Sequence, residues 1–169
     1  EGLKHGTPLL LRMLEDKGVG ATFFFTGAAA REHPEVAREV VRVGFEVGNH
    51  ALYHETVGEP LFPVPGVQPL LPEEVPHRLE VAHQWVAEAA GREPVSFRSP
   101  RLFGGTVVTN ALEAMGYLAD ASYPMYFYRE RLVPYHPSAE DWTQEGDLRL
   151  LEIPNFADMA MESQDEYGR

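Results

Sequence analysis

The sequence contains no cysteine among its 169 residues. Disulfide bridges and thiolate metal ligands are therefore both excluded, and any metal must be held by histidine and carboxylate side chains. Long hydrophobic runs are also missing, because Arg12, Arg38 and Arg42 interrupt the most apolar segments. A membrane span needs roughly 20 consecutive apolar residues, so we expect no membrane partner and no transmembrane segment.

Positive charge is scarce as well. Lys and Arg number 14 against 26 Asp and Glu residues, which gives a formal net charge of −12 at pH 7. This balance leaves no basic stripe for a phosphate backbone, so it excludes nucleic acid and other polyanions as partners and favours neutral or cationic substrates. The length, with a hydrophobic content of 44%, favours one domain with one substantial core.

Helical and strand-like segments alternate along the chain. The helix signals are an N-cap Thr7 followed by Pro8, then apolar repeats and closing glycines. They predict helices over 7–18, over 34–44, from a start within 73–77 to residue 90, and over 106–115. Short β-prone runs predict strands at 21–26, 45–49, 95–97, 117–121 and 148–153. Between them, segment 58–76 carries six prolines and predicts a loop packed over the domain. This alternation predicts an α/β fold with a mainly parallel sheet.

The chain is organised around one strand and the two histidines that follow it. Strand 45–49 ends at His50, and His54 comes four residues later. Four residues are about one helical turn, so both imidazoles can face the same way. Two neutral imidazoles are half of a divalent metal site, which zinc would suit best. The alternative is a pair of solvated loop histidines.

Further polar residues stand where other predicted strands end, and these ends meet at one edge of a parallel sheet. Arg98 follows one strand, where an arginine commonly pairs with a nearby acid. Asp120 either contacts metal or substrate, or organises a turn through its own backbone. The aromatic loop 135–142 either lines a sugar groove or packs on itself, and His83 reads as a core histidine on the apolar face of its helix.

Four motifs in fixed order carry a resemblance to a known family. They are ATFFFTG at 21–27, GNHALYH at 48–54, FRSP at 97–100 and DAS at 120–122. Together they resemble the polysaccharide deacetylases with a NodB homology domain, carbohydrate esterase family 4, over most of the chain up to about Phe156.

The resemblance implies a distorted β/α barrel with a divalent metal, usually zinc, bound by one aspartate and two histidines. It implies that His50 and His54 are the two histidine ligands, and that Arg98 is the arginine that pairs with the catalytic aspartate. The implied activity is metal-dependent removal of N-linked acetyl groups from amino-sugar polymers or oligomers. Arginine suits the orienting task because its planar fork binds a carboxylate bidentately and keeps its charge.

The chain also departs from the family pattern. The aspartate pair that ends the family's first strand is absent, as is the late histidine motif, so we expect residues 1–169 to be one catalytic domain that is incomplete at both ends. Arg101 stands where an aromatic residue usually follows the motif proline, which suggests an altered substrate. Two alternatives follow: a related amidohydrolase of small linear or cyclic amides, or a non-catalytic sugar-binding relative that lacks the carboxylate base.

Overall fold

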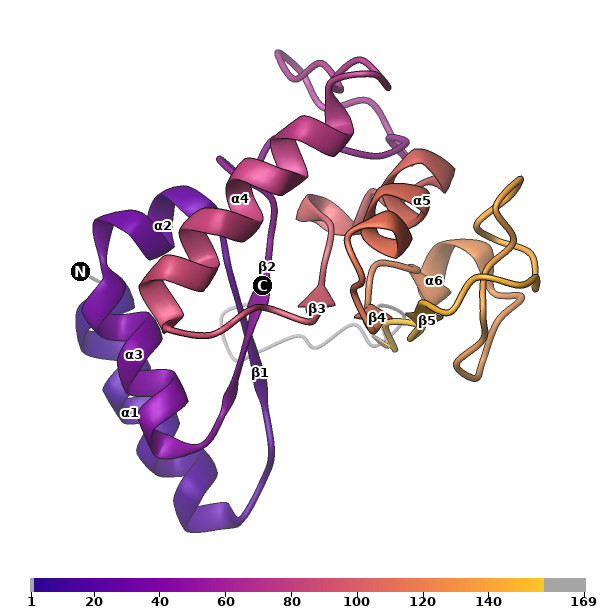
Figure 1. Ribbon diagram of the computed structural model, residues 1–169. Helices are drawn as coiled ribbons and strands as arrows, with labels where there is room; N and C mark the ends of the chain where they lie inside the picture. The colour runs from indigo at the N-terminus through magenta and orange to yellow at the C-terminus, as the bar shows by residue number, and fades with distance from the viewer. Residues whose placement is uncertain (1, 157–169) are drawn as a thin grey trace.

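A computed structural model describes residues 2–156, and its five strands form one parallel sheet (Figure 1). The strands lie side by side in chain order: β1 Thr22–Phe25, β2 Glu46–Asn49, β3 Ser96–Phe97, β4 Ala119–Asp120 and β5 Leu151–Glu152. This arrangement confirms the α/β fold with a parallel sheet. Over these residues the sheet is open, with β1 and β5 at its two edges.

Helices connect the strands and cover the sheet. They are α1 Gly2–Lys17, α2 Gly27–Glu32, α3 Pro34–Val43, α4 Val75–Ala90, α5 Thr106–Ala114 and α6 Met125–Tyr128, with a 3₁₀ helix, η1, at Pro100–Leu102. The long helix α4 packs across α2 and α3 and also contacts α5 (Figure 1). In the described part of the chain, no helix combines the length and the apolar character that crossing a bilayer requires.

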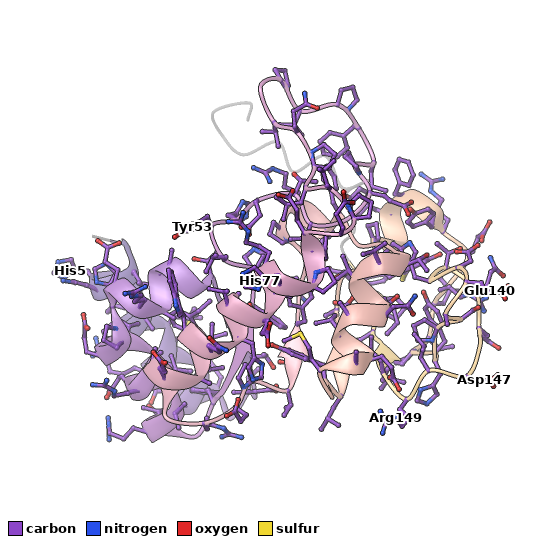
Figure 2. All side chains as sticks on the ribbon, turned by 45° about the horizontal axis from the view of Figure 1, so that its top comes forward. His5, Tyr53, His77, Glu140, Asp147 and Arg149 are labelled. Carbon is purple, nitrogen blue, oxygen red and sulfur yellow. The ribbon has the colours of Figure 1, made fainter. Side chains whose placement is uncertain are left out.

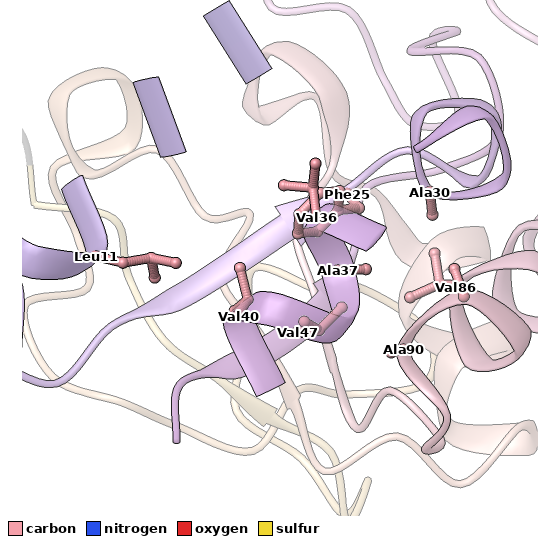
Figure 3. Close-up of a cluster of buried hydrophobic side chains, with 10 residues drawn as sticks. Leu11, Phe25, Ala30, Val36, Ala37, Val40, Val47, Val86 and Ala90 are labelled. Atoms are coloured by element: carbon pink, nitrogen blue, oxygen red, sulfur yellow. The ribbon is translucent and has the colours of Figure 1, made fainter. Parts of the chain in front are cut away.

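One of the core clusters lies between the first two strands and the helices that cover them. Figure 3 shows Val36 and Val40 of α3 together with Phe25 of β1 and Val47 of β2. Side chains alternate along a strand, so residues two positions apart in β1 and in β2 face the same helices. Fixing β1 and β2 against this core fixes the place where β2 ends, and therefore the position of the first histidine.

Three sequence expectations need correction. The first helix begins at Gly2, not at Thr7, and Pro8 lies inside it; Leu3 packs against the core and gives the added turn its apolar contact. Helix α2 was not predicted, because its alanines form no apolar repeat. Its signal is Thr26, whose Oγ1 accepts a hydrogen bond from the Ala29 N–H at 3.2 Å.

The strands also differ from expectation in length, since β4 and β5 have only two residues each. The register of the strands shows which residues lie side by side across this sheet. Asn49 is paired with Phe97, Phe97 with Asp120, and Asp120 with Glu152, so these four residues form one row across the sheet. The residue that follows each of them points to the opposite face.

Within the described residues, that opposite face borders a hollow. A pocket of about 490 Å³ lies against it, lined mainly by alternate strand residues: Thr22, Phe24, Glu46, Ser96, Arg98, Ala119, Ala121 and Ile153. The hollow runs along this face from the starts of β1 and β2, at Thr22 and Glu46, to the carboxyl ends of the other strands, at Arg98, Ala121 and Ile153. The carboxyl ends are the usual place for chemistry in parallel α/β folds.

Candidate functional site

His50 continues the sheet by one residue and its ring is held in place. Its N–H donates to the Phe25 carbonyl at 2.8 Å, and its ring Nδ1 lies 2.6 Å from the Arg98 carbonyl oxygen. Because a carbonyl can only accept, Nδ1 carries the proton and Nε2 keeps a free lone pair. Burial lowers the pKa of His50, with smaller contributions from the nearby charges of His54, Arg98 and Arg101, while the bond to the Arg98 carbonyl opposes the shift. The ring is therefore neutral at pH 7.

His54 stands beside His50, with 5.0 Å between the two ring centroids. The intervening loop rests on the start of α2, because the N–H groups of Gly27 and Ala28 donate to the carbonyls of Ala51 and Leu52, both at 2.9 Å. The structure thus brings together the two imidazoles that the spacing paired. Within residues 2–156, no further histidine or carboxylate joins them in a group of three that could hold a metal.

Arg98 follows β3 on the same face of the sheet as His50. Its Nε donates to the Ala121 carbonyl at 3.1 Å, and its guanidinium carbon lies 4.8 Å from the centroid of the Phe24 ring. Burial lowers the pKa of Arg98 and the charge of Asp120 opposes this, but an arginine remains charged at any physiological pH. Among the described residues no acid forms an ion pair with Arg98, so its remaining N–H groups are available.

Asp120 lies in the row that faces away from the hollow and has no exposed surface. Its carboxylate accepts a hydrogen bond from the Ser122 hydroxyl, and it is paired across the sheet with Glu152, which is equally buried. Glu152 Oε1 also accepts from the N–H groups of Ser122 at 3.0 Å and Tyr123 at 2.7 Å. Burial raises the pKa of Asp120 to about 6 and that of Glu152 well above its usual range. The pair therefore holds a proton at neutral pH.

No role was predicted for Glu152 from the sequence, although one signal was present. A charged residue stands between Leu151 and Ile153 in a β-prone run, which is the pattern of a carboxylate turned toward a polar partner. The turn held by Asp120 and Glu152 is connected to the site through Ser122, whose Oγ accepts a hydrogen bond from the N–H of Ser99 at 2.8 Å. Ser99 directly follows Arg98.

Arg101 contacts the loop that carries His54. Its Nη1 donates to the main-chain carbonyl of His54 at 3.1 Å and lies 3.5 Å from Thr56 Oγ1. The sequence identified Arg101 only as a departure from an aromatic residue. Its contact with the histidine loop joins positions 47 residues apart and could not be inferred from local pattern.

Two further expectations concerned His83 and the aromatic loop 135–142. His83 is half-buried rather than part of the core, and both of its ring nitrogens have partners, with Nδ1 2.9 Å from the Tyr117 hydroxyl and Nε2 2.6 Å from Glu93. The aromatic loop packs on itself, because Tyr135 and Trp142 are 4% and 2% exposed and leave no face for a sugar.

The proline-rich loop 58–76 packs over the domain, as expected. Phe62 lies edge-on to Phe103 with 5.0 Å between the ring centroids, and the Glu59 N–H donates to the Gly104 carbonyl at 2.7 Å. Together with α5 and the start of α4, the loop encloses a mainly apolar pocket of about 430 Å³.

The geometry can be set beside known proteins. A family model described as polysaccharide deacetylase matches residues 1–119, which is more than half of the chain. The chain belongs to the polysaccharide deacetylase family. This confirms the resemblance seen in the four sequence motifs, and the matched range of the deacetylase domain includes both histidines and both arginines.

Individual relatives of this polysaccharide deacetylase domain agree. It is 29% identical over 111 residues to a chitooligosaccharide deacetylase of Azorhizobium caulinodans, covering 65% of this chain and 48% of that protein. It is 24% identical over 140 residues to a peptidoglycan-N-acetylglucosamine deacetylase of Bacillus cereus, covering 83% and 55%. A crystal structure assigned to the polysaccharide deacetylases, from Mycobacterium smegmatis, superimposes with a TM-score of 0.73 at 27% identity and covers 92% of this chain and 47% of that one. The chain thus spans about half the length of the relatives it matches.

Proposed function

We propose that this polysaccharide deacetylase domain takes part in metal-dependent hydrolysis of N-linked acetyl groups on amino-sugar polymers or oligomers. The observation that carries the proposal is the state of the histidine pair. The Arg98 carbonyl fixes the His50 ring so that Nε2 is free, and the His54 ring lies 5.0 Å away. The substrate class is supported by the names of the relatives, which act on chitooligosaccharides and on the N-acetylglucosamine of peptidoglycan.

The donor set fits a divalent metal, with zinc foremost. A ligating histidine usually donates its other ring N–H to a carbonyl or carboxylate, and His50 already does so. Burial keeps the ring of His50 neutral, which is the form that binds metal. His50 and His54 would hold the ion, and the residues described here supply these two ligands and no third. When bound, such a metal supplies Lewis acidity toward the acetamide carbonyl.

The other two proposed site residues act through charge and position. Arg98 lies on the hollow face with N–H groups available, so it would hold a carboxylate base or an anionic oxygen of the reaction in a fixed direction. Asp120 has no exposed surface, so we assign it no contact with substrate. It would act by fixing the turn at Ser122 and by balancing the charge of Arg98.

The test replaces one ligand and keeps a matched control. His50→Ala should lose bound zinc and the release of acetate from N-acetylglucosamine oligomers, with little change in melting temperature, because the ring contributes one backbone contact to the fold. His77→Ala removes an exposed histidine of α4 and should change neither (Figure 2). Metal stoichiometry by mass spectrometry and acetate assays give the answer. A His50→Ala protein that retains full zinc content would refute the ligand assignment.

One observation favours a second candidate. Within residues 2–156, no carboxylate completes a metal-holding group with the histidine pair, which is what a non-catalytic sugar-binding relative would show. That protein would bind N-acetylglucosamine oligomers in a titration and release no acetate, with or without zinc. Hydrolysis of small cyclic amides in place of sugars would instead support the amidohydrolase alternative, which Arg101 suggests.

A further inference from the structure

Left-handed backbone conformations gather around the histidine pair. Residues 2–156 contain five non-glycine residues with positive φ: Ala51 (63°), His54 (65°), Arg101 (58°), Leu102 (59°) and Arg129 (59°). The first four belong to the histidine loop and to the turn that contacts it. A non-glycine residue adopts this conformation at a cost in free energy and keeps it only where surrounding contacts hold it. Contacts with other residues must therefore hold these two turns in their left-handed conformation.

One side chain joins them. Arg101 Nη1 donates to the His54 carbonyl at 3.1 Å, and Thr56 Oγ1, on a buried residue, lies 3.5 Å away. No backbone N–H in the described part of the chain donates to that carbonyl, so the guanidinium is its partner there. Arg101 itself sits in the short helix η1, which directly follows the Arg98 strand end.

The two histidines are fixed by different means. The ring of His50 is held directly, through its own Nδ1. The ring of His54 is exposed and makes no hydrogen bond within residues 2–156, so its direction follows from the main chain that carries it. We propose that Arg101 is a positioning residue, which holds the His54 turn in its left-handed conformation and thereby keeps this imidazole beside that of His50. The inference deepens the proposed function and rests on it for the role of the histidine pair.

The experiment compares three variants of the full chain. Arg101→Ala removes the donor, and Arg101→Lys keeps a charge and one donor. Arg129→Ala is the matched control, because Arg129 is also a left-handed arginine that donates to a main-chain carbonyl, that of Tyr126 at 3.4 Å, and it belongs to neither turn. The first readout is the ¹⁵N order parameter of the His54 amide in metal-free protein. The second is zinc affinity by calorimetry.

In Arg101→Ala the His54 order parameter should fall from about 0.85, typical of rigid backbone, to below about 0.6. Zinc affinity should fall about tenfold or more, as it does when partners that orient metal ligands are removed. Arg101→Lys should recover part of both, and Arg129→Ala should change neither. If the alanine variant fails to fold, Arg101→Gln takes its place with the same expected direction.

Unchanged His54 dynamics and zinc affinity in Arg101→Ala would overturn the proposal, and so would equal losses in Arg129→Ala, which would point to left-handed backbone strain alone. The order parameter separates this inference from the proposed function. If the unsubstituted chain binds no zinc but Arg101→Ala still loosens His54, the positioning contact stands and the metal assignment fails.

Discussion

The buried carboxyl pair is the most unusual feature at the scale of single residues. Asp120 and Glu152 are both 0% exposed and lie next to each other at the ends of neighbouring strands. Two carboxylates in contact cannot both be ionised without a large electrostatic cost, so the pair retains a proton. Together the two carboxyl groups fix the turn at Ser122. Glu152 accepts hydrogen bonds from two backbone N–H groups, and Asp120 accepts one from the Ser122 hydroxyl.

This pair predicts a pH dependence of stability. The pKa of Asp120 is raised to about 6 in the folded chain, above the value of 3.8 for a free aspartate. Between these values the folded state binds more protons than the unfolded state, so the free energy of unfolding should fall as the pH rises from about 4 to about 6, and the raised pKa of Glu152 should continue the fall above that range. Each pKa unit is worth about 1.4 kcal/mol, which gives a loss of roughly 1–3 kcal/mol over this window.

Asp120→Asn should remove most of that slope, because its amide can donate to Glu152 without a titrating proton and can still accept from Ser122. Urea unfolding at several pH values measures it. Asp147→Asn is the control, since Asp147 lies exposed at the surface (Figure 2). A slope that persists unchanged in Asp120→Asn would assign it to other groups.

At the scale of helices and strands, the sequence pattern was sufficient to predict a helix where its apolar repeat and its end signals lie within the segment itself. The apolar repeat and closing Gly44 predicted α3, and the start of α4 fell at Val75 within the predicted 73–77. Pattern failed for α2, which a single threonine cap starts, and for the lengths of β4 and β5, which are set by how many residues find a neighbouring strand. The histidine pair was predictable because it is local. The contacts of Arg101 and Glu152 cross 47 and 30 residues of sequence and depend on tertiary packing.

The docking of loop 58–76 makes a prediction at this same scale. Gly58 lies against the backbone carbonyls of Phe103 and Gly104, with no room for a Cβ atom. Gly58→Ala should force the loop away and lower the free energy of unfolding by about 1–3 kcal/mol, the usual cost of overpacking. Gly20→Ala is the control, because a Cβ there meets no atom within 4 Å. Equal urea midpoints for the two variants would mean that the loop adapts freely.

At the scale of the whole molecule, the net charge of the chain is opposite in sign to the charge of the arginines beside the site. The chain carries a net charge of −12, yet the histidine pair is flanked by Arg98 and Arg101. Local cations suit an anionic reacting group, while the overall field attracts cations over longer distances. Deacetylation turns a neutral acetamide into an ammonium group, so the proposed substrate is neutral and the proposed product is cationic.

We therefore expect the overall field to act on the product more than on the substrate. Raising the ionic strength from about 0.01 M to about 0.1 M shortens the Debye length from about 30 Å to about 10 Å and screens the field of the distant acids. Fully deacetylated glucosamine oligomers should bind several-fold more weakly after this change, whereas acetylated oligomers of equal length should bind equally well at both salt concentrations. Calorimetric titration of both oligomers at the two salt concentrations measures the difference. If the cationic oligomer instead binds more tightly as salt increases, repulsion by the two arginines outweighs the acidic surface, and the product leaves the site under local rather than overall charge.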